Sequence, residues 1–264
     1  MGPVCWIGEA PGRTSTSAMA LWRTGVITLA LVTLATLAGC QTPGPAPLGQ
    51  RVVGSGHIVT KIYDPTDFDR VEVENDFTVE VSQSTNYRVF ISADDNLFDF
   101  IRANKEGRTL RIALDPDRIY HNVTVEARIG MPSLSGLKLA NRVQATIGGF
   151  KSARTFDVDV SGHSRLGGRV EARDTAIRLS GASVVTLDGS GTRLRVDGTE
   201  GSQANLEGYR VEDASIHLSG RATATVNASD DLDADLSDGS TLIYVGNPSL
   251  GRVSTTGGSS LSRK

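Results

Sequence analysis

Residues 177–187 read IRLSGASVVTL, and this stretch decides the fold because the chain repeats its plan. Apolar and polar residues alternate in Ile177-Arg-Leu179, as they do in a β-strand with one buried face. The Ser-Gly-Ala-Ser sequence that follows is typical of a tight turn. A second short apolar stretch completes the segment, which therefore predicts two short strands joined by a turn.

Six other segments share this plan: LKLANRVQATI (137–147), VDVSGHSRL (158–166), LRVDGTEGSQANL (194–206), IHLSGRATATV (216–226), DADLSDGSTLIYV (233–245) and VSTTGGSSL (253–261). The second turn position is occupied by Asn141, Gly162, Gly181, Glu200, Gly220, Asp238 and Gly257, at spacings of 21, 19, 19, 20, 18 and 19 residues. Gly, Asn and Asp are the residues that best tolerate a positive φ. Glu200 departs from this pattern, and we expect a local distortion there.

A recurring turn with a period of about 19–20 residues predicts an all-β, right-handed parallel β-helix-like solenoid. In such a coil each period is one rung, and every turn stacks on the turn of the previous rung. A β-sandwich of hairpins is the alternative, because short strands separated by turns also occur there. A meander of hairpins gives no reason to reuse one turn at a fixed spacing, so we favour the solenoid.

The residues before this repeat are expected to continue the coil. Val71, Val89 and Leu110 lie in strand-like stretches 18 and 21 residues apart. Five of the seven phenylalanines lie at positions 68, 77, 90, 98 and 100, so we expect the widest part of the core here. Residues 94–104 (DDNLFDFIRAN) are expected to form a helical turn or a loop that covers the open end of the coil.

The first forty residues carry a targeting signal. Residues 25–38 form an apolar run of 14 residues, preceded by Arg23. A membrane-spanning helix needs about 20 apolar residues, so this run has the length of a signal-peptide core. It ends in Leu37-Ala-Gly-Cys40, which resembles a bacterial lipobox, where the cysteine thiolate accepts a diacylglyceryl group. Cys40 is therefore the predicted lipidation site.

These features divide the chain into four parts. We expect translation to begin at Met19, because the residues before it fit no part of a signal. The parts are an upstream stretch (1–18), a lipoprotein signal peptide (19–39), a proline-rich tether (40–50) and the β-helix domain (51–264).

The expected location is the bacterial cell envelope, with the membrane as a partner through acyl chains on Cys40. Gln41 stands where an aspartate retains many lipoproteins in the inner membrane. In a Gram-negative cell we therefore expect the outer membrane or the periplasm.

Composition excludes several classes of function. The 27 basic and 30 acidic residues nearly cancel, so the chain has no basic footprint for nucleic acid. Two cysteines exclude a multi-bridge disulfide scaffold and a zinc ribbon. The four histidines lack metal-site spacing such as HExxH, and no Gly-x-Ser-x-Gly nucleophile motif occurs. We therefore predict no catalytic residue, no metal and no cofactor.

The turns supply the candidate site residues, which are Ser161, Gly162, Ser164, Ser180, Gly181, Ser183, Ser219, Gly220, Ser240 and Gly257. We interpret this turn ladder as structural, with serine hydroxyls bonded to turn backbone within and between rungs. A hydroxyl ladder that binds sugars is the alternative. The acidic run of residues 230–235 is interpreted as a solvated face rather than a calcium site, since the GGxGxD repeat is absent.

Several short motifs, taken in order, resemble one protein family. They are Val53-Gly-Ser-Gly56, Asp95-Asn-Leu97 leading into residues 107–112, and the Ser-Gly-x-Ser turns that begin at Ser161 and Ser180. In this order the sequence resembles, over residues 53–264, the bacterial family named "putative auto-transporter adhesin, head GIN domain". The resemblance implies a parallel β-helix-like fold and an adhesin-type protein without a catalytic motif. Residues 140–143 and 199–202 depart from the turn motif, so we expect those rungs to be less regular.

The leading hypothesis is a lipid-anchored, non-enzymatic envelope protein that acts as an adhesin-like or structural binding surface for a glycan or another envelope component. The rival is a polysaccharide-active β-helix enzyme, a lyase or hydrolase, for which Lys151, Arg154 and Arg178 are candidates by residue type alone. A third hypothesis is a module that binds an envelope protein. Lyases of this shape build clefts from long insertions, and the repeat spacing after Met131 leaves no room for one.

Overall fold

The computed structural model describes residues 49–264, except for the side chains of Ser152 and Ala153. Cys40, the signal peptide and the tether up to residue 48 therefore lie outside the described residues. Residues 49–264 form 19 strands and one short 3-10 helix, η1. No helix in this part of the chain is long and apolar enough to span a membrane.

In chain order the elements are β1 (Gln50–Val53), β2 (Ile58–Tyr63), β3 (Arg70–Glu74), β4 (Thr78–Gln83), β5 (Arg88–Asp94), η1 (Asp95–Leu97), β6 (Ile101–Glu106), β7 (Thr109–Leu114), β8 (Arg118–His121), β9 (Val125–Met131), β10 (Gly136–Ala140), β11 (Gln144–Ser161), β12 (Arg165–Leu179), β13 (Val184–Ser190), β14 (Arg193–Gly198), β15 (Gln203–Leu218), β16 (Thr223–Leu236), β17 (Thr241–Gly246), β18 (Ser249–Thr255) and β19 (Ser260–Arg263).

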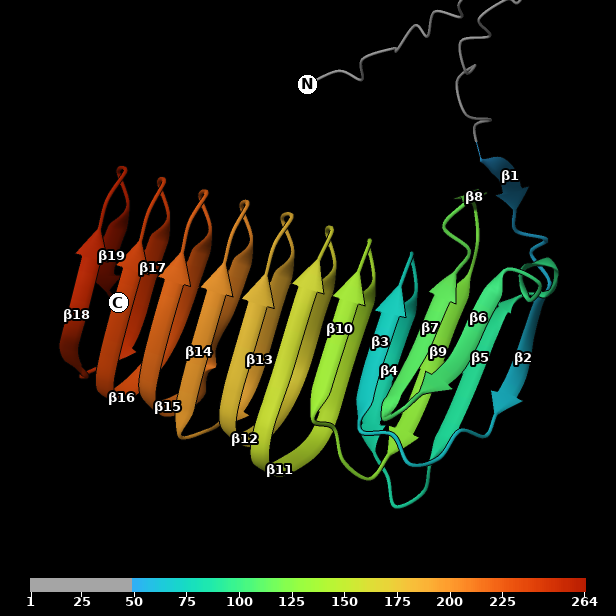
Figure 1. Ribbon diagram of the computed structural model, residues 1–264, viewed down its shortest axis with the longest axis horizontal. Helices are drawn as coiled ribbons and strands as arrows, with labels where there is room; N and C mark the ends of the chain where they lie inside the picture. Colours follow the sequence, from blue (N-terminus) through green and yellow to red (C-terminus); the bar gives the residue numbers. More distant parts are fainter. Residues whose placement is uncertain (1–48) are drawn as a thin grey trace, which may run out of the picture. The chain divides into compact units, whose positions relative to one another are not determined.

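All strands except the β1–β8 pair lie in two layers that enclose the core (Figure 1). Layer A contains, in spatial order, β6, β7, β3, β10, the second half of β11, the second half of β12, β14, the second halves of β15 and β16, and β18. Layer B contains β2, β5, β9, β4, the first halves of β11 and β12, β13, the first halves of β15 and β16, β17 and β19. The four long strands thus pass from layer B of one rung into layer A of the next.

Neighbouring rungs pair in parallel, and their register follows the sequence period. Val158 lies opposite Leu137 on one side and Ile177 on the other. Ile216 lies in the same way between Val196 and Ala234. The prediction of a β-solenoid of stacked parallel strands is confirmed, with about six turns, and the β-sandwich alternative is wrong.

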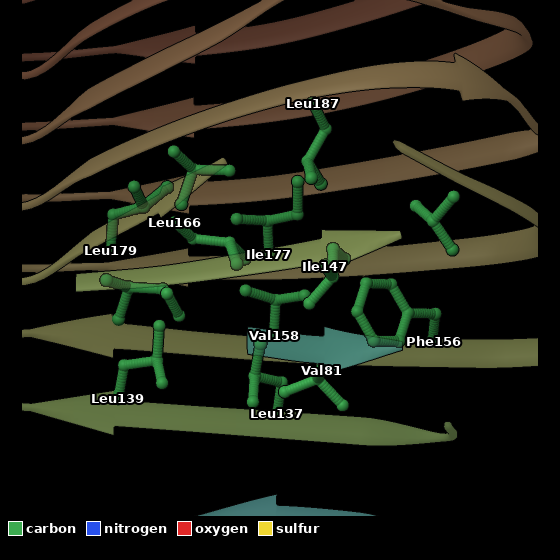
Figure 2. Packing of buried hydrophobic residues seen from close by; sticks show 14 of the residues in the cluster. Val81, Leu137, Leu139, Ile147, Phe156, Val158, Leu166, Ile177, Leu179 and Leu187 are labelled. Carbon is green, nitrogen blue, oxygen red and sulfur yellow. The ribbon is translucent and has the colours of Figure 1, made fainter. Parts of the chain in front are cut away.

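The core fills the space between the layers. Figure 2 shows side chains of both layers meeting there, among them Val158 and Ile177 from layer A and Ile147 and Leu187 from layer B. Each of these four residues is at most 1% exposed. Burying one aliphatic side chain contributes about 1.5–3 kcal/mol, so the inward half of every strand supplies the main driving force for folding. The alternation seen in the sequence therefore marks the inward residues correctly.

The residues before Met131 extend both layers but break the regular coil. β3 lies between β10 and β7, so Val71 faces Leu137, 66 residues further along the chain, and Leu110. Both pairings are parallel, which confirms the prediction for Leu110. β5 instead runs antiparallel to β9, and the prediction that the stretch around Val89 continues the coil is wrong because the chain turns back there.

The N-terminal end of the stack is formed by strands that run antiparallel to their neighbours, and we call these strands, β5 and β6, the reversed rung. β5 and β6 run antiparallel to β9 and β7, η1 joins them, and β2 adds antiparallel to β5. A helical turn within residues 94–104 is therefore confirmed for η1, whereas the chain from Ile101 onward forms β6. Phe68 and Phe77 are fully buried near this end.

A buried carboxylate fastens the loop after β1 to the reversed rung. Asp94 is 1% exposed, and its two oxygens accept the backbone N–H groups of Gly56 at 2.6 Å and Thr124 at 2.7 Å. The hydroxyl of Ser55 donates to Asp95 Oδ1 at 2.6 Å. The Val-Gly-Ser-Gly and Asp-Asp-Asn motifs of the sequence thus meet in space and hold each other.

Candidate functional site

The turns form one edge of the solenoid and share a single conformation. Two consecutive residues of each turn have a positive φ, which is the geometry of a type I′ turn. The first of these two residues is Asn75, Asn141, Gly162, Gly181, Glu200, Gly220, Asp238 or Gly257, with φ between 54° and 68°. Seven of them are the positions predicted from spacing, and Asn75 adds an eighth turn that the sequence analysis missed.

Backbone hydrogen bonds tie each turn to the next. The second turn residue donates its N–H to the carbonyl of the first residue of the following turn: Asp76 to Asn141, Arg142 to Gly162, His163 to Gly181, Ala182 to Glu200, Gly201 to Gly220 and Arg221 to Asp238, at 2.8–3.0 Å. A side chain on Gly162 would place its Cβ 2.9 Å from the backbone N of Asn141. The close stacking, together with the positive φ, therefore requires glycine at this position.

Glu200 does not distort its turn, so the expectation of a local irregularity there is wrong. Its φ of 54° matches that of its neighbours. Its carboxylate accepts the backbone N–H of Gly181, one rung away, at 3.0 Å. This bond offsets part of the strain that a non-glycine residue has at positive φ.

The serines that follow the turns point into the molecule. Ser164, Ser183 and Ser240 are fully buried, and Ser202 is 1% exposed. Ser164 Oγ accepts the N–H of Val143 at 3.2 Å, and Ser240 Oγ donates to the carbonyl of Leu218 at 3.1 Å. These two bonds run between rungs, as the structural interpretation predicts, whereas Ser183 Oγ has no hydrogen-bond partner among residues 49–264. A sugar cannot reach Ser164, Ser183 or Ser240, so the alternative of a sugar-binding hydroxyl ladder is wrong for them.

The other ladder residues, Ser161, Ser180 and Ser219, are half-buried at the ends of their strands. Ser219 helps to close its turn through its backbone, because its carbonyl accepts the N–H of Ala222 at 3.2 Å. The turn edge is therefore an element of architecture.

The outward side of layer A carries a row of ionisable residues in which Asp or Glu alternates with Arg, Lys or His from strand to strand. This charged row consists of Arg111, Glu72, Lys138, Asp159, Arg178, Asp197, His217 and Asp235. Arg111 lies 3.3 Å from Glu72, which also accepts a hydrogen bond from Lys138. That hydrogen bond raises the pKa of Lys138. The charges of this face thus neutralise one another across the rungs.

A groove of about 550 Å³ lies beside this row, over β12, β14, β15 and β16. Its rim carries Arg193, whose Nε lies 2.7 Å from Asp174 Oδ1 and holds the pKa of Asp174 below its ordinary value. Asp213, which lies opposite Arg193, and Asp231, which lies opposite Asp213, also line it, and the charge of Asp213 helps to raise the pKa of Arg193. In the described part of the chain no three His, Cys, Asp or Glu side chains come together in a way that could hold a metal ion.

The residues considered for catalysis are not among those that line this groove. Lys151 pairs with Glu171 Oε2 at 3.1 Å, and Arg178 belongs to the charged row between Asp159 and Asp197. Arg154 is exposed near the bend of β11. The structure therefore does not bring the three candidates together.

Part of the outward side of layer B, from β11 to β17, is almost free of charge. Its two central rows, from β11 to β17, are Gln144, Arg165, Val184, Gln203, Thr223 and Thr241, and Thr146, Gly167, Thr186, Asn205, Thr225 and Ile243. We call these residues the hydroxyl–amide face. Arg165 is its single charged residue.

The polar groups of the hydroxyl–amide face are largely unused inside the molecule. Asn205 donates to Thr186 at 3.5 Å, and Ser260 to Thr241 at 3.3 Å. The side chains of Gln144, Thr146, Gln203, Thr223 and Thr225 make no hydrogen bond to another residue of the described range. This is the feature that sequence reasoning missed, because the face exists only once the register places these residues side by side.

Comparisons with known proteins show which family and which solved structures this chain resembles. The model of the family described as "putative auto-transporter adhesin, head GIN domain" matches residues 67–248. A comparison with curated proteins gives no match.

Three solved structures show the same fold. A putative adhesin from Bacteroides fragilis has a TM-score of 0.74 at 17% identity, and covers 81% of this chain and all of its own. A putative lipid binding protein from Parabacteroides distasonis has a TM-score of 0.66 at 15% identity, with coverage of 81% and 100%. A putative adhesin from Parabacteroides merdae has a TM-score of 0.64 at 15% identity, with coverage of 82% and 100%.

Proposed function

Because the chain belongs to the family described as "putative auto-transporter adhesin, head GIN domain", we propose that it is a non-enzymatic, lipid-anchored binding protein of the bacterial cell envelope. The family points to a protein of the cell surface or envelope. The proposed anchor is a diacylglyceryl group on Cys40, which the proline-rich tether links to the solenoid in the sequence.

The hydroxyl–amide face is the proposed binding surface, and its unused polar groups carry the proposal. Parallel strands lie about 4.8 Å apart, and residues i and i+2 of one strand about 6.6 Å apart. The rows therefore present hydroxyl and amide groups at regular intervals along the solenoid. A polymer with repeating hydroxyl groups, such as a polysaccharide, offers hydrogen-bond partners at regular intervals as well.

The charged row makes layer A a poorer candidate for an uncharged polymer. Its side chains already pair with one another, as Arg111 and Lys138 do with Glu72. A ligand would have to break these ion pairs, whereas at the threonines and glutamines of layer B it would displace only bound water.

Binding and catalysis are tested together on a panel of polysaccharides that includes peptidoglycan. The full chain, held in detergent, is incubated with each polymer, and retention and the release of new sugar ends are measured. We expect retention without release. Release of sugar ends would show an enzyme, and retention by no polymer would favour the envelope-protein hypothesis.

The face itself is tested by adding charge at two of its exposed or half-exposed threonines. The double variant Thr186→Lys, Thr225→Lys is expected to weaken retention about tenfold, because a bulky charged side chain blocks hydrogen bonding and is hard to desolvate. Ser215→Lys on the outward side of layer A is the matched control. Equal loss in both variants, or in neither, would exclude this face.

The anchor is tested by Cys40→Ala. This change removes the thiolate that accepts the lipid, so we expect the protein to leave the membrane fraction and appear in the soluble fraction. Persistence of the variant in membranes would contradict lipidation at Cys40.

A further inference from the structure

A hollow of about 390 Å³ lies on the outward side of layer B, at the N-terminal end of the hydroxyl–amide face. Its residues come mainly from β4, β5 and β9, with Thr60 from β2 and Ser84 just after β4. The register sets their order: Phe90 lies opposite Arg128, which lies opposite Glu80. Glu80 in turn lies opposite Thr146, the first residue of a row of the hydroxyl–amide face. The hollow therefore continues that row, and a polymer lying on the face would reach it.

The neighbouring row of the hollow contains Gly130, and a Cβ at this position would lie 3.3 Å from Cβ of Ser84. Gly130 lies between Arg88 on β5 and Ser82 on β4 in the neighbouring row. Ser84 lines the same space. Hydroxyl groups thus stand on one side of the opening and a guanidinium group on the other.

The charge of the hollow is unbalanced, unlike that of the charged row. Arg128 Nε lies 4.0 Å from Glu80 Oε2, and the two side chains are 71% and 64% exposed, so this pair contributes little. Arg88 is exposed and has no ion-pair partner among residues 49–264. The hollow is therefore lined by two guanidinium groups, those of Arg88 and Arg128, and by one carboxylate, that of Glu80.

The aromatic ring of Phe90 lies in the same row of the hollow as Arg128 and Glu80. Phe90 is half-buried between Ile62, which is 65% exposed, and Arg128. In the described chain the cation–π contacts are those of Lys61 with Phe98 and Arg118 with Phe100, so no cation covers the ring of Phe90. A ring in this position offers an apolar surface to a ligand that also needs polar partners.

We propose that this hollow is a subsite for a sugar unit that carries a carboxylate, such as a uronic acid. The guanidinium forks of Arg88 and Arg128 suit a planar carboxylate, the serine hydroxyls suit sugar hydroxyls, and the ring of Phe90 suits the C–H face of a sugar ring. The inference rests on the proposed function, because the hollow serves as the acidic end of the polymer-binding face.

The test uses two polymers that differ only in charge. Polygalacturonate carries a free carboxylate on each unit, and its fully methyl-esterified form does not. Dissociation constants for the full chain in detergent are measured by titration calorimetry, at two salt concentrations. We expect binding to the acid form to be at least about tenfold tighter and to weaken with salt.

Variants locate the selectivity. Arg88→Gln and Arg128→Gln are each expected to weaken binding of polygalacturonate roughly tenfold and to leave binding of the ester unchanged. Phe90→Leu is expected to weaken both. Lys105→Gln, which removes an exposed cation on β6 in the other layer, is the control and is expected to change neither. Thermal unfolding of each variant checks that the fold is kept.

The outcomes separate this inference from the proposed function. Equal binding of acid and ester, or selectivity that survives both arginine changes, would overturn the subsite and leave neutral-polymer binding intact. Inorganic phosphate that displaces polygalacturonate at a lower concentration than galacturonate does would overturn the carboxylate in favour of a phosphoryl group. Loss of neutral-polymer retention in the threonine variants bears only on the proposed function.

Discussion

The rungs from β10 to β19 and the strands from β1 to β9 build the same two layers by different rules. In the first region every strand has its neighbour 17–21 residues away, and all pairings are parallel. In the second, β3 pairs with β10 across 66 residues, and β2, β5 and β6 are antiparallel.

The difference shows what a repeat contributes. A repeated rung needs only inward apolar residues, a turn with two positive φ angles and a bend, because the previous rung supplies the template. The N-terminal region has no template on one side, and it ends the stack with reversed strands and with specific polar contacts such as those of Asp94. Variants that act on each region test this division.

The largest effect is expected from a charge in the core of a repeated rung. Leu179 is 3% exposed, and Leu179→Asp removes its apolar contacts and buries an unpaired carboxylate. We expect a loss of about 4 kcal/mol or more, which would leave most of the chain unfolded. Thermal unfolding followed by circular dichroism measures it, with Thr186→Asp on the exposed side of layer B as the control. An unchanged melting temperature would mean that Leu179 faces solvent.

A bend between the layers is the next most sensitive place. Gly189 has a φ of 131°, and a Cβ there would lie 1.9 Å from the carbonyl oxygen of Val170 on the neighbouring rung. Gly189→Ala is therefore expected to cost about 3 kcal/mol, measured by urea unfolding. Gly167→Ala is the matched control, since a Cβ at Gly167 meets nothing within 4 Å. Similar midpoints for the two variants would contradict the described bend.

In the N-terminal region a smaller and more local effect is expected. Asp94→Ala leaves the N–H groups of Gly56 and Thr124 without their acceptor, at a cost of about 2 kcal/mol. Hydrogen exchange should accelerate in the loop after β1 and around Thr124, and stay unchanged in the rungs from β12 onward. Acceleration throughout the chain would mean that the two regions unfold as one unit. Asp99→Ala, at an exposed position on the same segment, is the control.

The smallest effect concerns pH and an ion pair of the same region. Arg108 Nη2 lies 2.6 Å from Asp69 Oδ2, and its hydrogen bonds hold the pKa of Asp69 below its ordinary value. A lowered folded-state pKa stabilises the protein at pH values above the unfolded pKa of about 4, and this contribution disappears as pH falls through the folded value. Arg108→Gln should thus lower the melting temperature slightly at pH 7, and the gap to the unchanged chain should close in acid. A gap that persists at pH 2 would show that the pair acts through packing.

The turns and the inward residues were predictable because they depend on local chemistry. Gly162, Gly181 and Gly220 recur at a fixed spacing, and Ile177 and Leu179 alternate with polar neighbours, so the period predicts both the turn and the buried side. The turn at Asn75 was missed because its partner turn at Asn141 lies 66 residues away, outside any period.

The proposed binding surfaces could not be predicted from the alternation of apolar and polar residues, because alternation does not show which strands pair or in which register. Thr186 and Asn205 are both outward residues by pattern, but their place in one row follows from the pairing of β13 with β15. The hollow around Phe90 could not be predicted from the sequence pattern, because β5 is antiparallel to its neighbour whereas the period predicts a parallel strand. Register and strand direction, both set by long-range contacts, decide which outward residues share a surface.

The long stretch of chain between the paired strands β3 and β10 also sets an order of assembly. Closing a loop of 66 residues costs about 1 kcal/mol more in chain entropy than closing one of 19, and contacts between distant residues form slowly. A chain that emerges from a ribosome or a translocon with its N-terminus first exposes β3 and β4 long before β10 and β11 exist. We expect the later rungs to zip together quickly once they emerge, and the first-made strands to be the last to reach their final neighbours. The strands that come first in the sequence are then the part of the domain that stays open longest to chaperones and proteases.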